Sequence, residues 1–155
     1  MWKVLAFLGL MLPAVASAKK SKSYVNGYFG YGQGGIAIGA DYEMKWDKVA
    51  GWGGYLLSYG SSDTGPGGLA VGGFLRPHIR KKGYDLHLTA GFGLLNYETQ
   101  AESSTALGPL IGFGCTKKIT KDIYIGLDSM HHYGWFSEPT GILINSGLLT
   151  VRYRL

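Results

Sequence analysis

The chain has 155 residues, a formal net charge of +5, 26 glycines, 14% aromatic residues and 16% charged residues. This length suits one domain, but a water-soluble domain usually carries about 25% charged residues, so the composition argues against an ordinary soluble globular protein. Cys115 is the single cysteine and excludes an internal disulfide.

The first 18 residues have the layout of a secretory signal peptide. Lys3 supplies a basic start, residues 4–12 form an apolar run, and Ala16-Ser17-Ala18 form a small-residue cleavage pattern. An N-terminal membrane anchor is the alternative, but the apolar run is too short to cross about 30 Å of hydrocarbon as a helix. The pattern predicts cleavage after Ala18 and an exported mature chain over residues 19–155.

Alternation of apolar residues with small or polar ones recurs along the mature chain, which is typical of β-strands. We predict eight strands, over residues 24–32, 36–46, 49–60, 68–77, 84–97, 105–117, 123–133 and 142–154. In the second of these, Ile36 and Ile38 share one face, while Gly39 and Asp41 share the other. The pattern predicts an all-β protein, an eight-stranded antiparallel up-and-down barrel without a second domain.

The apolar face of these strands has two alternative placements. In a soluble lipocalin-like barrel it would fill the inside, leaving an outer surface of glycines with few charges, which is poor in water. In an outer-membrane barrel it meets lipid, and a narrow lumen holds the small and polar residues. Aromatic residues near strand ends would then form girdles at the membrane interfaces: Trp46, Trp52, Tyr59, Tyr84, Tyr97 and Tyr153. The second placement is favoured, and it predicts an integral protein of the outer membrane of a Gram-negative cell.

Charge placement supports the same strand count. Every Lys and Arg of the mature chain lies near a terminus or in or beside the expected turns at residues 46–48, 78–83 and 117–122. The opposite connections carry only acids: Asp63, Glu98, Glu102 and Glu138. We therefore expect a solvated basic rim, with His78 in its second turn, and no nucleic-acid partner, since no basic patch is interleaved with stacking aromatics.

A family resemblance is seen best in "LTAGFGLLNY", "GPLIGFGCTKKITKDIYIGLDSMHHYG" and the closing "GLLTVRYRL". Over its whole length the mature chain resembles the small eight-stranded outer-membrane barrels of the OmpX, OmpA and opacity type, although Leu155 stands where a terminal aromatic residue is usual. Outer-membrane lipids, lipopolysaccharide and the barrel-assembly machinery are the expected partners. We expect a closed lumen rather than a pore, because eight strands leave a lumen that side chains fill. We expect no cofactor, because "GGIAIG" lies in a strand without the helix that a phosphate loop requires.

The densest group of reactive side chains lies in "SMHHYGWFSEPTG", residues 129–141. Its candidate catalytic residues are Ser129, His131, His132, Ser137 and Glu138. A histidine beside a serine and an acid can form a hydrolytic relay. The alternative is a set of interfacial side chains with polar tips at the headgroup level. We expect no metal site here, because adjacent histidines on a strand point to opposite faces.

The same stretch is similar to the lipid A deacylase family of eight-stranded barrels. That resemblance implies a His-x-Ser pair near the outer rim, helped by a glutamate, which cleaves an acyl chain from lipopolysaccharide. His132-Tyr133 matches the family's "HY", but Gly134 occupies the position of the nucleophilic serine. The incomplete motif favours the interfacial interpretation.

Ionisable residues also fall on the lumen side of the predicted strands: Asp41, Glu43, Asp85, His87 and Asp128. They could form a proton or ion path, or a buried polar network that fills and stiffens the lumen. The network is favoured because buried charges need partners. The sequence therefore predicts a non-enzymatic outer-membrane barrel acting in envelope structure or surface interaction, with a deacylase-type hydrolase as the alternative.

Overall fold

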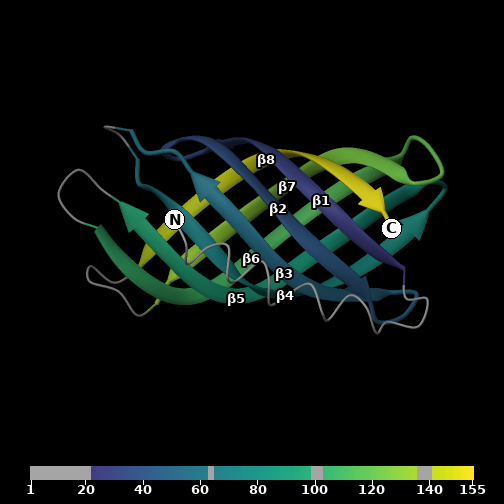
Figure 1. Cartoon of the computed structure of the whole chain (residues 1–155), viewed down its shortest axis with the longest axis horizontal. Helices are drawn as coiled ribbons and strands as arrows, with labels where there is room; N and C mark the ends of the chain where they lie inside the picture. Colours follow the sequence, from purple (N-terminus) through teal and green to yellow (C-terminus); the bar gives the residue numbers. More distant parts are fainter. Residues whose placement is uncertain (1–21, 63–64, 99–102, 136–140) are drawn as a thin grey trace.

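The computed structural model describes residues 22–62, 65–98, 103–135 and 141–155, and the predicted signal peptide lies outside them. Its strands are β1 (Ser23–Gly32), β2 (Gly35–Lys45), β3 (Ala50–Tyr59), β4 (Gly67–Lys81), β5 (Tyr84–Glu98), β6 (Ser103–Lys118), β7 (Ile123–Gly134) and β8 (Ile142–Arg154). Consecutive strands pair antiparallel, and β8 pairs with β1 to close a barrel of slanted strands (Figure 1). The predicted all-β, eight-stranded barrel is confirmed. The described part of the chain has no helix long and apolar enough to cross a membrane.

The two ends of the barrel differ in their connections. The basic end holds residues 22 and 155, the connections at residues 46–49, 82–83 and 119–122, and the lysines beside them; the opposite end is called the loop end. At the basic end, Asp47 Oδ1 accepts the backbone N–H groups of Val49 at 2.6 Å and Ala50 at 2.7 Å, which lowers the pKa of Asp47.

The turn between β4 and β5 is much tighter than the sequence predicts. Only Lys82 and Gly83 form it, both with positive φ (50° and 83°), which is the conformation of a two-residue hairpin turn that follows the twist of the strands. β4 therefore continues to Lys81, and His78 pairs with His87 of β5. The predicted turn at residues 78–83 was wrong for residues 78–81, which belong to β4. A run of basic residues is typical of a solvent-exposed turn, and this led to the wrong prediction.

The outer face of the barrel carries an apolar belt. Large exposed apolar side chains include Phe29, Ile38, Leu56, Leu75, Leu88, Phe92, Phe113, Leu127 and Leu149. Trp46, Trp52, Tyr84 and Tyr153 point outward as predicted. Tyr59 and Tyr97 do not: they are 4% and 0% exposed and lie inside the barrel, so their assignment to the outer girdles was wrong. Both occupy inward positions of the alternation in β3 and β5.

The interior near the loop end is packed with apolar and aromatic side chains. The cluster includes Ala37, Tyr55, Leu57, Tyr59, Ala70, Leu95, Tyr97, Ala106, Leu110, Met130, Ile144 and Leu148. Glycines in the wall make room for the larger of these. A Cβ atom at Gly72 or Gly93 would lie 2.8 Å or 2.6 Å from the Tyr55 hydroxyl, so the narrow barrel accommodates that ring only beside residues without a side chain.

Candidate functional site

Polar and charged side chains fill the interior near the basic end. We call them the lumen network: Asn26, Tyr28, Asp41, Glu43, Arg76, His78, Asp85, His87, Thr89, Asp128, Thr150 and Arg152, all buried. They come from six strands, each at an inward position of the period-2 alternation. The structure brings all five lumen residues predicted from the sequence into this one network.

Arg76 of β4 crosslinks the network to β2 and β5. Its Nη1 atom donates to Glu43 Oε2 at 3.0 Å, and its Nη2 atom donates to Asp41 Oδ2 at 2.7 Å. Its Nε atom donates to Thr89 Oγ1 at 2.9 Å. The guanidinium plane also lies over the Phe74 ring, 4.2 Å from the centroid. Arg76 thus has its charge compensated on two sides, as a fully buried cation requires.

Arg152 of β8 makes a second set of crosslinks. Its Nε atom donates to Asn26 Oδ1 at 2.6 Å, its Nη1 atom to Asp85 Oδ2 at 2.9 Å and its Nη2 atom to Glu43 Oε2 at 3.2 Å. Asn26 belongs to the neighbouring β1, whereas Glu43 and Asp85 belong to β2 and β5, so one side chain also ties the closing strand to strands that it does not pair with. Arg76 and Arg152 meet at Glu43.

Glu43 is the centre of the network. Besides both arginines at Oε2, its Oε1 atom lies 2.8 Å from His78 Nε2. Gly51 on the neighbouring β3 leaves space for this carboxylate, because a Cβ atom there would lie 2.5 Å from Oε1. Four interior carboxylates (Asp41, Glu43, Asp85 and Asp128) face three guanidinium groups (Arg76, Arg80 and Arg152), and His78 lies between two of these carboxylates, Glu43 and Asp85.

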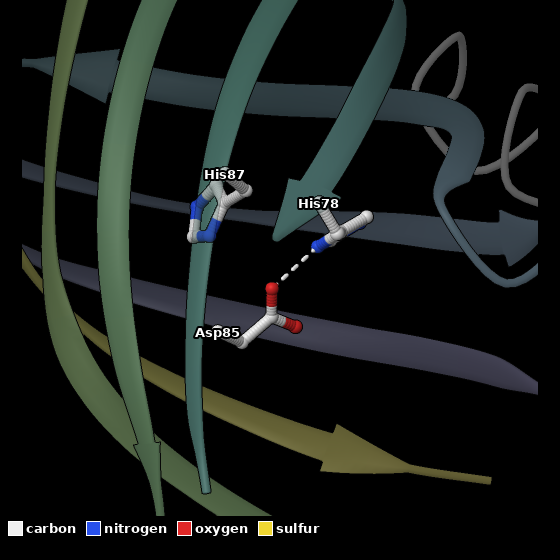
Figure 2. Close-up of side chains that lie close together, drawn as sticks. All are labelled: His78, Asp85 and His87. Carbon is white, nitrogen blue, oxygen red and sulfur yellow. Dashed lines mark hydrogen bonds and ion pairs between the residues drawn. The ribbon is translucent and has the colours of Figure 1, made fainter. Parts of the chain in front are cut away.

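His78, Asp85 and His87 lie together at one side of the network (Figure 2). His78 Nδ1 is 2.8 Å from Asp85 Oδ1, and with its Nε2 on Glu43 both ring nitrogens of His78 face carboxylates. His87 Nε2 is 2.6 Å from Asp128 Oδ1, while His87 Nδ1 is buried without a hydrogen-bond partner. Thr150 completes the site by donating its hydroxyl to the other oxygen of Asp128.

Three members of the network were misplaced by the sequence pattern. His78 was expected in a solvated turn and Arg76 and Arg152 at the basic rim, yet they are 3%, 0% and 1% exposed. The alternation could have placed these residues inside the barrel. Arg76 and His78 lie two and four residues after Phe74, so their side chains point to the same face of β4. Arg152 lies two residues after Thr150 and points to the same face of β8. Buried carboxylates need cationic partners, and Arg76, His78 and Arg152 are cationic or ionisable residues at inward positions.

The two adjacent histidines of β7 separate as alternation requires. His132 faces the loop-end interior, where its Nδ1 atom lies 2.8 Å from the Tyr59 hydroxyl and its ring packs against that of Tyr55. Its Nε2 atom is buried without a partner. Ser129 and His131 face outward instead, so His132 is not part of any site that they form.

On the outer wall, Ser129, His131 and Asn145 form a hydrogen-bonded chain. Ser129 Oγ lies 3.0 Å from His131 Nε2, and His131 Nδ1 lies 2.6 Å from Asn145 Oδ1. All three side chains are half-buried, and the His131 ring stacks on Phe113 of β6. Sequence spacing pairs Ser129 with His131, but Asn145 is found only from the strand register, which sets it directly opposite His131.

The remaining reactive residues of the sequence lie elsewhere. Ser137 and Glu138 fall outside the described residues. Cys115 is exposed on the outer wall, as the alternation predicts. The outward polar chain of the described residues thus contains one serine, one histidine and one asparagine.

The architecture is shared with small outer-membrane barrels of known structure. The N-terminal β-barrel domain of OprF from Pseudomonas aeruginosa matches with a TM-score of 0.70 at 13% identity, over 87% of this chain and 98% of that one. Neisserial surface protein A (NspA) matches with a TM-score of 0.66 at 10% identity, over 86% and 96%. The Yersinia pestis protein Ail, solved with the heparin analogue sucrose octasulfate, matches with a TM-score of 0.51 at 15% identity, over 88% and 100%.

No protein-family model matches the sequence, and no curated protein matches it either. The structural likeness at these low identities concerns the fold. The chain has the fold of integral outer-membrane β-barrel proteins, as the sequence predicts, and its apolar outer belt and polar interior suit a position in that membrane.

Proposed function

We propose that this chain is an integral barrel of the outer membrane with a filled interior, acting in envelope structure or surface interaction and not as a channel. The observation that carries the proposal is the burial of Arg76 and Arg152, which reach across the interior to carboxylates on other strands. Side chains that meet across the interior support a lumen without a continuous water path. The apolar cluster near the loop end adds a second barrier.

Ion conductance in planar lipid bilayers tests this proposal. The purified, folded protein should give no stepwise current above that of the bare bilayer, while a general porin inserted under the same conditions gives clear steps. Heat-dependent gel mobility confirms that the protein is folded before insertion. Regular single-channel steps from the folded protein would contradict a filled interior.

The loop end limits what a surface interaction can be. Its longest connections are residues 60–66 and 135–141, and Asp63, Glu98, Glu102 and Glu138 are its charged residues. The similar protein Ail was solved with a sulfated ligand, but an acidic loop end repels sulfate. A small basic or neutral partner fits this end better than an anionic glycan does.

A second candidate function, a deacylase-type hydrolase, is favoured by the Ser129–His131–Asn145 chain. In such a relay the histidine takes the serine proton, and the third residue holds the ring in the correct orientation. The group faces the lipid side of the wall, where an acyl chain of a membrane lipid would lie. It differs from the deacylase motif in the order of serine and histidine, and Asn145 stands in place of an acid.

Mass spectrometry of lipid A separates the two functions. Cells with the wild-type protein are compared with cells that lack it and with cells that carry Ser129→Ala, His131→Ala or His132→Ala. The filled-barrel proposal expects one lipid A pattern in all strains. The hydrolase expects a species one acyl chain shorter in the wild type, lost with Ser129→Ala and His131→Ala. His132→Ala is the matched control, because His132 lies inside the barrel away from Ser129.

A further inference from the structure

We propose that His78, Asp85 and His87 form a binding site for one divalent transition-metal ion of the zinc class inside the barrel. One ligand atom from each residue lies within 4.8 Å of those from the other two, and all three side chains are buried (Figure 2). Two imidazoles and one carboxylate are a donor set that Zn²⁺ prefers, with water in the fourth position. Ca²⁺ and Mg²⁺ prefer oxygen ligands and fit it poorly.

In both histidines Nε2 faces a carboxylate outside the proposed site, so Nδ1 is the nitrogen that the ion would bind; His78 Nδ1 now faces Asp85 Oδ1. His78 Nε2 lies 2.8 Å from Glu43 Oε1, and His87 Nε2 lies 2.6 Å from Asp128 Oδ1. A carboxylate that accepts one ring N–H fixes the tautomer and directs the other nitrogen to a metal, as is usual for metal-binding histidines. In both rings that other nitrogen is Nδ1.

His87 Nδ1 gives independent support. It is buried and has no hydrogen-bond partner among the described residues, although buried polar atoms are rarely left unpaired. The wall is shaped to hold this ring in place. A Cβ atom at Gly114 would lie 2.2 Å from Asp128 Oδ1 and 2.5 Å from His87 Nε2, so the absence of a side chain there allows the His87–Asp128 pair.

Binding exchanges a proton for the ion. The 2.8 Å hydrogen bond between His78 Nδ1 and Asp85 Oδ1 contains one proton, and the ion takes its place. A Zn–Nδ1 bond forms as that proton leaves to solvent, and His87 brings a free lone pair. Ligand atoms around a tetrahedral Zn²⁺ lie roughly 3.3 Å apart, given Zn–N bonds of about 2.0 Å. His78 Nδ1 and Asp85 Oδ1, now 2.8 Å apart, must therefore separate slightly to admit the ion.

The proposed site lies beside a pocket at the basic end of the barrel. Asp85 lines a pocket of about 190 Å³ there, together with Arg80, Lys81, Lys82 and Lys118. These cations repel a metal ion at low ionic strength, so loading should be carried out near physiological salt, where screening acts over about 8 Å.

The test uses the full-length protein folded in detergent micelles and stripped with a chelator. After dialysis against Zn²⁺, metal analysis should find one ion per chain, and the same protein loaded with Co²⁺ should show the intense visible bands of tetrahedral coordination. His87→Ala should weaken Zn²⁺ affinity by about tenfold or more, since even losing a residue that supports a ligand costs that much. His132→Ala is the matched control, because it removes another buried histidine with an unpaired nitrogen, and it should bind as the wild type does.

Nuclear magnetic resonance of the wild-type histidine ring nitrogens keeps the test decisive if a variant fails to fold. Zn²⁺ should shift the Nδ1 signals of His78 and His87 and leave their Nε2–H groups in place. Zn²⁺ uptake by His87→Ala equal to that of the wild type would overturn the proposal. No uptake by the wild type, or shifts confined to His131 and His132, would also overturn it.

Discussion

Replacing Glu43 with glutamine should lower the free energy of unfolding by about 3–5 kcal/mol, the usual cost of breaking a buried ion pair by removing one partner. Glu43 accepts from Arg76 Nη1 at 3.0 Å and from Arg152 Nη2 at 3.2 Å, and it lies 2.8 Å from His78 Nε2. Glutamine keeps the size of the side chain. However, it removes the charge and turns one acceptor oxygen into a donor amide that faces other donors.

The matched control is Asp122→Asn at the basic end. Asp122 Oδ1 accepts from Arg154 Nη2 at 2.7 Å, but both side chains are partly exposed, at 38% and 21%. Solvent-exposed pairs contribute about 0–1 kcal/mol, so this variant should stay within that range. Urea unfolding in lipid vesicles, followed by tryptophan fluorescence, gives the change in unfolding free energy for both variants. This holds if neither variant changes the slope of the unfolding free energy against urea concentration. A Glu43→Gln cost no larger than that of Asp122→Asn would refute the reasoning.

Three further substitutions test other parts of the barrel with the same unfolding assay. Leu88→Arg places a charge on the lipid face and should lower the free energy of unfolding by about 2–4 kcal/mol. A negligible change would mean that Leu88 does not face lipid. Gly93→Ala should cost about 1–3 kcal/mol by overpacking, because its Cβ would lie 2.3 Å from the Val71 carbonyl oxygen and 2.6 Å from the Tyr55 hydroxyl; Tyr55→Phe should relieve only the second part of that cost. Asp47 has a lowered pKa because the backbone N–H of Val49 binds its carboxylate. Its stabilisation should therefore be present above about pH 4, its ordinary range, and be lost as the pH falls further. The difference between the wild type and Asp47→Asn should shrink with acid, and a constant difference would contradict this.

Alternation alone predicts most of the barrel. In β6, for example, Ile111 and Phe113 face outward while Leu110 and Gly112 face inward, as the sequence indicates. A strand has only two faces, so once one face is apolar the orientation of every residue follows. The strand count and the closure between β1 and β8 follow because the same antiparallel hairpin repeats along the chain.

The sequence could not predict which inward residues meet. Arg152 and Asp85 are far apart in the chain, and their 2.9 Å contact depends on the barrel bringing β8 and β5 across a narrow interior. The outward pairing of His131 with Asn145 likewise depends on the β7–β8 register. Turn length was a third unknown, because nothing in the basic run before Lys82 marks the point where the strand ends.

The glycines of the wall and the large side chains of the interior are parts of one arrangement. Gly51 leaves space for Glu43, and Gly114 leaves space for the His87–Asp128 pair. Apolar side chains could fill a narrow barrel without the free-energy cost of removing charged groups from water. Stability alone therefore does not favour an interior filled with ion pairs. Glu43, His87 and Asp128 thus each lie against a wall position where a side chain would collide with them. A network fixed so closely is suited to a task that needs charge at a defined place, such as the proposed binding of a metal ion beside His87.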